Sequence, residues 1–277
     1  MTDLAAAYAH CEALLRAEDP DAWLAALLAP ADARPHLHAL GAVAVEVALV
    51  RTRVKQAIAG EIRLQWWQDV VDGGRATEAA AHPVAAALVD TIDRAALPRA
   101  PFGDMLDAFR MDLYDEPPAD LPALERRLAA TRAVPIGFAA RVLGGGAAID
   151  PAAEHAGVAI GLADLLDALR AGHDPLLPVA LLARHGATRA EVAAGRDTPG
   201  LRAVAADLRS AARTRLAALR AKRGALGDAG PAFLRTALVE PRLKRGDRAA
   251  PFEPLPELPQ WRRQWRLWRA ARNGGVL

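Results

Sequence analysis

Apolar residues recur at the spacing of an α-helix along almost the whole chain, and Pro and Gly stand where this pattern breaks. No stretch alternates between apolar and polar residues for long enough to predict a strand. The apolar composition favours the same structure, because it contains 67 Ala but only 6 Ile and 17 Val. We therefore predict an all-α fold.

The breaks in the pattern divide the chain into separate helices. The predicted helices span residues 3–17, 21–29, 36–58, 61–72, 83–95, 101–114, 120–131, 135–143, 151–171, 176–185, 200–223, 231–243 and 256–272. No internal repeat and no long linker interrupts them. We predict one helical domain over residues 1–255, with a basic helix in residues 256–277 that is packed on it or appended to it.

Charge is distributed unevenly along the sequence. Residues 201–277 contain 17 basic and 6 acidic side chains, a net charge of +11, whereas residues 1–200 contain 18 and 27, a net charge of −9. Such asymmetry is typical of a chain with an anionic partner, such as a membrane surface or a nucleic acid. No recognised nucleic-acid-binding module accompanies the charge, so we do not expect a nucleic-acid partner.

Cysteine content and hydropathy bear on the compartment. The single cysteine, Cys11, excludes a disulfide framework and fits a reducing environment. Its position beside Leu14 and Leu15 in an amphipathic helix predicts a small core residue. No apolar run approaches the ~20 residues of a membrane span. We expect a cytoplasmic protein that can lie peripherally at the inner membrane.

The segment WRRQWRLWRAAR, residues 261–272, concentrates tryptophan and arginine. Trp261, Trp265 and Trp268 have the spacing of one helix face. The arginines that spread over the remainder are Arg262, Arg263, Arg266 and Arg269. One interpretation is an interfacial helix that contacts an anionic membrane or a protein partner. The other is a final helix whose tryptophans close the core and whose arginine stems cover it.

Glu46 is the only charged residue in the apolar stretch from Leu40 to Val50. A carboxylate in such a stretch either faces a cavity or is paired, because burying it alone is costly. Arg51 and Arg53 follow within reach. Glu46 and Arg51 are therefore candidate cavity residues, and a salt bridge or a narrow solvent-exposed stripe is the alternative for Glu46.

Pairs of aspartates three residues apart are the most conspicuous candidate metal ligands. They are Asp69 with Asp72, Asp90 with Asp93, Asp104 with Asp107, and Asp164 with Asp167. This spacing puts two carboxylates on one helix face, as Mg²⁺ bound through substrate phosphates requires, although solvated acidic faces produce it too. Asp164 and Asp167 rank first because they interrupt an apolar stretch. The histidines have no zinc-site spacing, and no phosphate-binding glycine loop or nucleophile elbow occurs.

An ordered series of blocks resembles the squalene/phytoene synthase family. The blocks are EIRLQWWQDVVDGG (61–74), HPVAAAL (82–88), FGDMLDAFRMDLYDEP (102–117), TRAVPIGFAARVLG (131–144), HAGVAIGLADLLDAL (155–169) and LLPVALLARHG (176–186). The resemblance covers roughly residues 35–270 and implies the all-α prenyl-synthase fold with a central cavity. It also implies Mg²⁺-dependent joining of two prenyl diphosphates, held by two aspartate-rich motifs.

Both aspartate-rich motifs are degenerate in this sequence. The first should fall within residues 39–53, where Glu46 is the only acid. At the second, Ala168 occupies the place of the first motif aspartate and Gly172 the place of the last. Electrostatic stabilisation is usually the largest catalytic term, so turnover by the family mechanism is not expected. We therefore assign no catalytic residue and no cofactor.

This degenerate pattern resembles the branch of the family that contains a mitochondrial assembly factor for respiratory NADH dehydrogenase (complex I). The branch implies a biogenesis or binding factor at the inner face of the respiratory membrane rather than a carotenoid enzyme. Our leading hypothesis is a non-catalytic accessory factor that acts with a respiratory-complex subunit and whose cavity holds an isoprenoid or other lipid. One alternative is an active prenyltransferase that has rebuilt a Mg²⁺ site from Glu46, Asp164 and Asp167 in one cavity. Another is a peripheral protein whose only activity is lipid binding.

Overall fold

The computed structural model describes residues 3–173 and 176–277, and within these residues it contains helices and no strand, as the sequence predicts. The first eight helices are α1 (Leu4–Glu18), α2 (Pro20–Ala26), α3 (Arg34–Ala48), α4 (Val50–Arg53), α5 (Ala57–Val71), α6 (Ala76–Ala81), α7 (Pro83–Arg94) and α8 (Ala100–Asp112). The later elements are α9 (Leu121–Leu128), η1 (Ala129–Ala133), α10 (Val134–Val142), η2 (Ala147–Ile149), α11 (Asp150–Arg170), α12 (Val179–Arg184), α13 (Arg189–Ala193), α14 (Pro199–Ala221), η3 (Arg223–Ala225), η4 (Gly227–Leu238), α15 (Val239–Gly246) and α16 (Gln260–Arg272).

Two large apolar cores hold the bundle together. The first lies among α1, α3, α5, α7 and α8 and contains the fully buried Trp67 and the buried Cys11, which confirms the predicted core role of that cysteine. The second lies among α9, α11, α14 and α15. Helix α10 packs against both, because Ala139 contacts the first core and Ile136 the second. The two halves therefore share α10 as a common wall.

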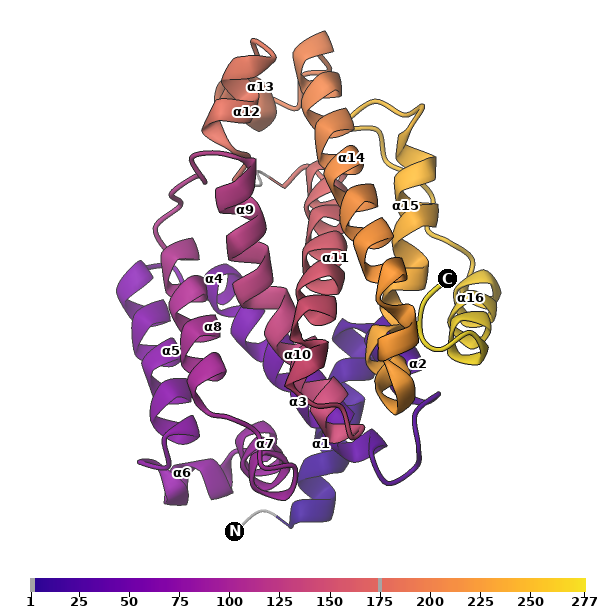
Figure 1. Ribbon diagram of the computed structural model, residues 1–277. Coiled ribbons are helices and arrows are strands. Elements are labelled where there is room, and N and C mark those ends of the chain that lie inside the picture. Colours follow the sequence, from indigo (N-terminus) through magenta and orange to yellow (C-terminus); the bar gives the residue numbers. More distant parts are fainter. Residues whose placement is uncertain (1–2, 174–175) are drawn as a thin grey trace.

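Helix α11 is the central helix of the second core and lies along α14 (Figure 1). Its close approach to η1, a π-helical turn, depends on glycine. A Cβ atom at Gly157 would lie 2.6 Å from the backbone nitrogen of Ala133. Single π-turns inside helices are frequent at functional sites. Here the turn carries Thr131 and Arg132, which both line cavities described below.

The predicted helix over residues 36–58 is wrong in its second half. Helix α3 ends at Ala48, a short α4 follows, and α5 begins only at Ala57. Val54 and Gln56 have extended backbone angles. No Gly or Pro marks this break, but β-branched residues at 50, 52 and 54 lower the helix propensity.

The structure also differs from the prediction in other helices. The predicted helix 231–243 is a 3₁₀ segment that passes into α15, because Pro231 and Pro241 lack the backbone N–H that a continuous α-helix needs. Helix α16 begins at Gln260 rather than 256, directly after Pro259. The short helices α6 and α13 were not predicted, although the capping box of Thr188 and Glu191 marks the start of α13.

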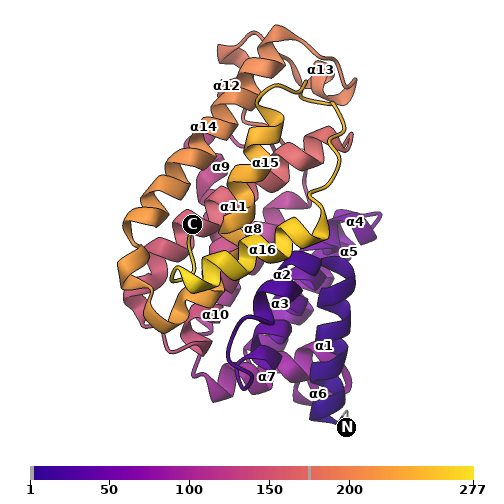
Figure 2. The same ribbon diagram turned by 90° about the vertical axis from the view of Figure 1, so that its right-hand side faces the viewer.

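Helix α16 lies across the outside of the molecule, against α2 and η4 (Figure 2). Leu267 and Ala270 are its buried residues, and they join a small core with Leu234 and Leu238. The tryptophan side chains lie on the outside, so they do not close the core. Within the described residues, no helix has both the length and the apolar character needed to cross a bilayer.

Candidate functional site

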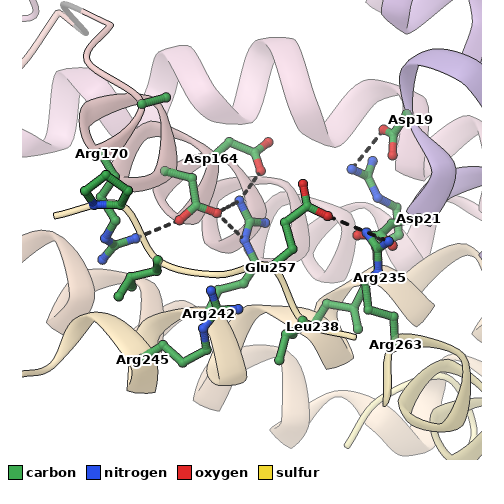
Figure 3. Close-up of a pocket in the computed structure, with 15 residues that line it drawn as sticks. Asp19, Asp21, Asp164, Arg170, Arg235, Leu238, Arg242, Arg245, Glu257 and Arg263 are labelled. Atoms are coloured by element: carbon green, nitrogen blue, oxygen red, sulfur yellow. Dashed lines mark hydrogen bonds and ion pairs between the residues drawn. The ribbon is translucent and has the colours of Figure 1, made fainter. Parts of the chain in front are cut away.

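A charged cavity of about 520 Å³ lies between α11, α15 and the segment that leads into α16 (Figure 3). Its acidic lining residues are Asp19, Asp21, Asp164, Asp167 and Glu257, and its basic ones are Arg170, Arg235, Arg242, Arg245 and Arg263. Leucines at 238, 255 and 258 supply apolar wall. The cavity contains Asp164 and Asp167, the aspartate pair that ranked first among the candidate metal ligands.

Two smaller cavities, of about 250 and 280 Å³, also have Asp164 in their walls. The smaller one is lined by a face of α3 that consists of Gly41, Ala44, Val45, Ala48 and Leu49. This is the region in which the family resemblance places the first aspartate-rich motif. The face of α3 that shares a cavity with Asp164 is therefore apolar and carries no carboxylate.

Arg242 of α15 binds both aspartates of the second motif region. Its guanidinium lies 2.8 Å from a carboxylate oxygen of Asp164 and 2.7 Å from one of Asp167 (Figure 3). Helix α11 presents these aspartates on one face because they are three residues apart. Arg132 of η1 lies 3.9 Å from the second oxygen of Asp164. Both carboxylates, which lie just before the second motif, are thus paired with arginine.

The ion pairs shift the ionisation of both partners. Burial by itself would raise the pKa of Asp164, but the nearby guanidinium groups of Arg242, Arg132 and Arg235 lower it below its ordinary value. Burial would likewise lower the pKa of Arg242, and its two aspartate partners raise it above its ordinary value. Asp164 and Arg242 are therefore both charged at neutral pH.

Arg170 completes the pairing of Asp167 from within α11. Its Nη1 atom lies 2.6 Å from Asp167, and only 7% of its side chain is exposed. Its Nε atom is buried without a hydrogen-bond partner among the described residues. Gly246 leaves room for the guanidinium, because a Cβ atom there would overlap Arg170 Nη2.

Two more ion pairs close the opposite end of the cavity (Figure 3). Arg235 lies 2.9 Å from Asp19, and Arg263 lies 3.2 Å from Asp21. Burial raises the pKa of Asp21 above its ordinary value, although Arg263 and Arg235 act in the opposite direction. These pairs tie η4 and α16 to the N-terminal helices.

The structure does not bring Glu46 together with Asp164 and Asp167. The Glu46 carboxylate is mostly buried and lies 3.1 Å from Arg63 and 3.8 Å from Arg53. It lines none of the three cavities. The paired alternative is therefore the correct one for Glu46, with Arg53 and Arg63 as its partners.

Arg51, the other cavity candidate, does share a cavity with Asp164. It lines the one of about 280 Å³ together with Arg127 and Arg132. It also pairs with Asp115. Of the four predicted cavity residues, Arg51, Asp164 and Asp167 lie in cavity walls and Glu46 does not.

The side chains present do not fit a magnesium ion held in the manner of the family. Carboxylate oxygens of Asp164 and Asp167 already accept hydrogen bonds from Arg242, so a cation there would face a fixed positive charge. Across residues 3–173 and 176–277, no group of three or more His, Cys, Asp or Glu side chains is placed to hold a metal ion. We therefore derive no metal-dependent step.

Sequence reasoning missed the three arginines that decide the electrostatics of this site. Arg242 is 78 residues from Asp164 along the chain, so no local spacing links them. Arg132 lies in a π-helical turn and Arg235 in a 3₁₀ segment. For Arg235 and Arg242, the sequence signal was the basic excess of residues 201–277 over an acidic remainder.

The family model described as squalene/phytoene synthase matches residues 15–269. The chain belongs to this family. Within it, the chain is 28% identical over 241 residues to NADH dehydrogenase (ubiquinone) complex I, assembly factor 6 of Mus musculus, a match that covers 85% of this chain and 72% of that protein. This agrees with the resemblance to the branch that contains the assembly factor.

Solved structures of the family share the fold. Squalene synthase HpnC from Alicyclobacillus acidocaldarius is 20% identical with a TM-score of 0.63, and the match covers 98% of this chain and 95% of that one. A dehydrosqualene synthase in complex with ligand is 18% identical with a TM-score of 0.78, covering 97% and 96%. The isoprenoid-synthase helical fold implied by the resemblance is therefore confirmed.

The second motif of this family can now be located in the structure. Ala168, which stands in place of its first aspartate, lines the cavity of about 280 Å³. Gly172, in place of its last, lies beyond the end of α11 with a φ of +77°, where a side chain would be strained. The end of α11 thus leads into a turn at Gly172, and the acidic side chains before it pair with arginine.

Proposed function

We propose that this protein is a non-catalytic member of its family that assists the assembly of a membrane respiratory complex. The observation that carries the proposal is the pairing of Arg242 with both Asp164 and Asp167. The family reaction needs Mg²⁺ ions beside the two prenyl diphosphates, and carboxylates of the protein hold these ions. Here Ala168 and Gly172 stand in place of the motif aspartates, and the carboxylates nearest to them, Asp164 and Asp167, are paired with Arg242 of the protein itself.

The absence of carboxylates on the facing helix supports the same proposal. The face of α3 that shares a cavity with Asp164 is lined by Gly, Ala, Val and Leu. The only acid of that region, Glu46, is paired with Arg53 and Arg63. The relative named as a complex I assembly factor supports the second half of the proposal, the role in assembly.

We further propose that the cavities hold an isoprenoid or another lipid with a polar head. The large cavity combines charged side chains with Leu238, Leu255 and Leu258. The neighbouring cavity of about 250 Å³ adds the apolar face of α3 and residues Ile136 and Ile160. Both cavities place apolar side chains beside charged ones, which suits an amphiphile because each part of it meets groups of its own kind.

Incubation of the purified protein with farnesyl diphosphate and Mg²⁺ tests the absence of catalysis. We expect no release of inorganic diphosphate above the buffer rate, while an active dehydrosqualene synthase under the same conditions releases it. Release that depends on both Mg²⁺ and this protein would overturn the proposal and establish the prenyltransferase alternative.

The assembly role is tested in cells of the source organism that lack the gene. We expect less assembled NADH dehydrogenase on native gels, with the other respiratory complexes unchanged, and recovery when the wild-type gene is returned. An unchanged amount of assembled NADH dehydrogenase would contradict the assembly role, whatever the result of the diphosphate assay.

A further inference from the structure

Helix α16 has two faces with different surroundings. Leu267 and Ala270 are buried against η4 and α2, and Arg263, on the same side, pairs with Asp21. The opposite side is open to solvent. Its exposed residues are Trp261, Arg262, Gln264, Trp265, Trp268, Arg269 and Arg272.

The helix is fixed in this orientation at both ends. Arg263 pairs with Asp21 near the start of α16. After the helix, the backbone N–H of Gly275 donates to the carbonyl oxygen of Ala270, and Val276 is buried. The inner face of α16 is therefore already packed against the body of the protein. The outer face stays exposed in the folded protein.

The three tryptophans form a continuous exposed apolar patch. Their exposed fractions are 64% for Trp261, 52% for Trp265 and 48% for Trp268. With roughly 250 Å² for a full tryptophan, the patch exposes on the order of 400 Å². Contiguous apolar patches of this size on a soluble protein mark interaction surfaces.

Arginines hold positive charge at the level of these rings. Each tryptophan has a guanidinium over its ring, at 5.1 Å for Arg262 over Trp261, 5.4 Å for Arg269 over Trp265 and 5.0 Å for Arg272 over Trp268. Within the part of the chain that the structure describes, no carboxylate pairs with Arg262, Arg266, Arg269 or Arg272. Most other arginines of residues 201–277 are paired, as Arg242 and Arg235 are.

We propose that the outer face of α16 docks on an anionic phospholipid bilayer. Tryptophan rings favour the interface between headgroups and acyl chains, and unpaired arginines at the same level meet the lipid phosphates. The face contains no acidic side chain, so its charge is complementary to an anionic surface over its whole length. This proposal concerns a surface rather than the cavity, and it does not depend on the proposed function.

Docking in this orientation also brings the large cavity close to the membrane. Leu255, Leu258 and Arg263 line that cavity, and they flank the start of α16, where Trp261 begins the exposed face. Figure 2 shows α16 and the segment that leads into it on the same side of the molecule. A lipid that leaves the bilayer beside Trp261 would therefore lie close to the cavity wall formed by Leu258 and Arg263.

Vesicle flotation of the full chain tests the proposal. We expect the wild type to float at low salt with vesicles of phosphatidylcholine and phosphatidylglycerol, and to float much less with phosphatidylcholine alone or at high salt. We expect the triple variant W261Q/W265Q/W268Q to stay with the unbound fraction. A matched control, I58Q/I62Q/M111Q, removes similarly exposed apolar side chains elsewhere and should float like the wild type.

Charge reversal gives the second arm of the test. Each arginine near an anionic surface contributes about fivefold to binding, so R262E/R269E should weaken binding at least about 30-fold. The control variant R126E/R196E changes the net charge by the same amount, at exposed arginines outside α16. It should float as the wild type does. A wild type that does not float would overturn the proposal, as would equal flotation of the α16 variants and their controls. Circular dichroism of every variant excludes misfolding as the cause.

Discussion

Arg242 is the single residue whose charge most changes the interpretation of this chain. Alone it would be one more arginine in a basic tail. In the structure it lies within 2.8 Å of two carboxylates on α11, the helix in which the family keeps its second aspartate-rich motif. A fixed guanidinium supplies positive charge that cannot leave or exchange, unlike a bound ion. The two carboxylates are thereby paired within the protein.

We predict that Arg242→Met destabilises the protein by about 2 kcal/mol at neutral pH, because it leaves two partly buried carboxylates without their main partner. The lowered pKa of folded Asp164 contributes stability above its ordinary pKa, which is lost as the pH falls through the lowered value. The difference in the free energy of unfolding between the variant and the wild type should therefore become smaller below about pH 4. Urea unfolding of both proteins between about pH 7 and about pH 3.5 measures it.

Arg266→Met is the control for this experiment. Arg266 lies on α16 and has no carboxylate partner within the described ranges. We expect its free energy of unfolding to stay within about 0.5 kcal/mol of the wild type. Equal losses for both variants at every pH would show that the Arg242 ion pairs do not stabilise the fold.

At the scale of elements, the contact between α11 and η1 decides how the cavities are formed. Residues of η1 face the cavities because a π-turn inserts an extra residue into the helical repeat. Gly157 lets the backbone of this turn lie directly on α11. Thr131 and Arg132 owe their positions to that contact.

We predict that Gly157→Ala lowers the free energy of unfolding by about 1–3 kcal/mol, because the new methyl group would meet the backbone of Ala133, which cannot move as a side chain can. Gly146→Ala is the matched control. A Cβ atom at Gly146 meets nothing within 4 Å, so this change should be neutral or stabilise by up to about 1 kcal/mol. Thermal unfolding of both variants distinguishes them, and an unaffected Gly157→Ala would contradict the close contact.

On the scale of the whole molecule, the two large cores meet through α10. We therefore expect them to unfold together. Leu208 is fully buried in the second core, and Leu208→Ala should cost about 2–5 kcal/mol. If the two cores unfold together, Leu208→Ala should lower the free energy of unfolding of the first core by the same amount as that of the second.

Tryptophan fluorescence reports mainly on the first core in the W261Q/W265Q/W268Q background, because Trp66 and Trp67 belong to that core and Trp23, the third remaining tryptophan, contacts Glu12 and Arg16 of α1. We expect Leu208→Ala to shift the fluorescence and far-ultraviolet circular dichroism transitions of this protein by the same denaturant concentration. A fluorescence transition that stays in place while the dichroism transition moves would show two independent units.

The helical class, the family and most helix positions follow from the amino-acid sequence alone, because they depend on local periodicity, on Pro and Gly, and on an ordered series of blocks. The sequence also shows the positions at which the family motifs lack their acidic residues. It could not predict the break after Ala48, which follows no Gly or Pro, or the fate of Glu46, whose nearer partner Arg63 lies on another helix.

The pairing of the acidic and basic parts of the chain depends instead on tertiary packing. Arg235 and Arg242 of the basic C-terminal part pair with acids of the N-terminal part, across long sequence separations that no local pattern encodes. The same packing leaves the arginines on the outer face of α16 without carboxylates, because Leu267 and Ala270 turn that face away from the body. Burial and pairing depend on which surfaces meet, and the chain specifies those surfaces only once it is folded.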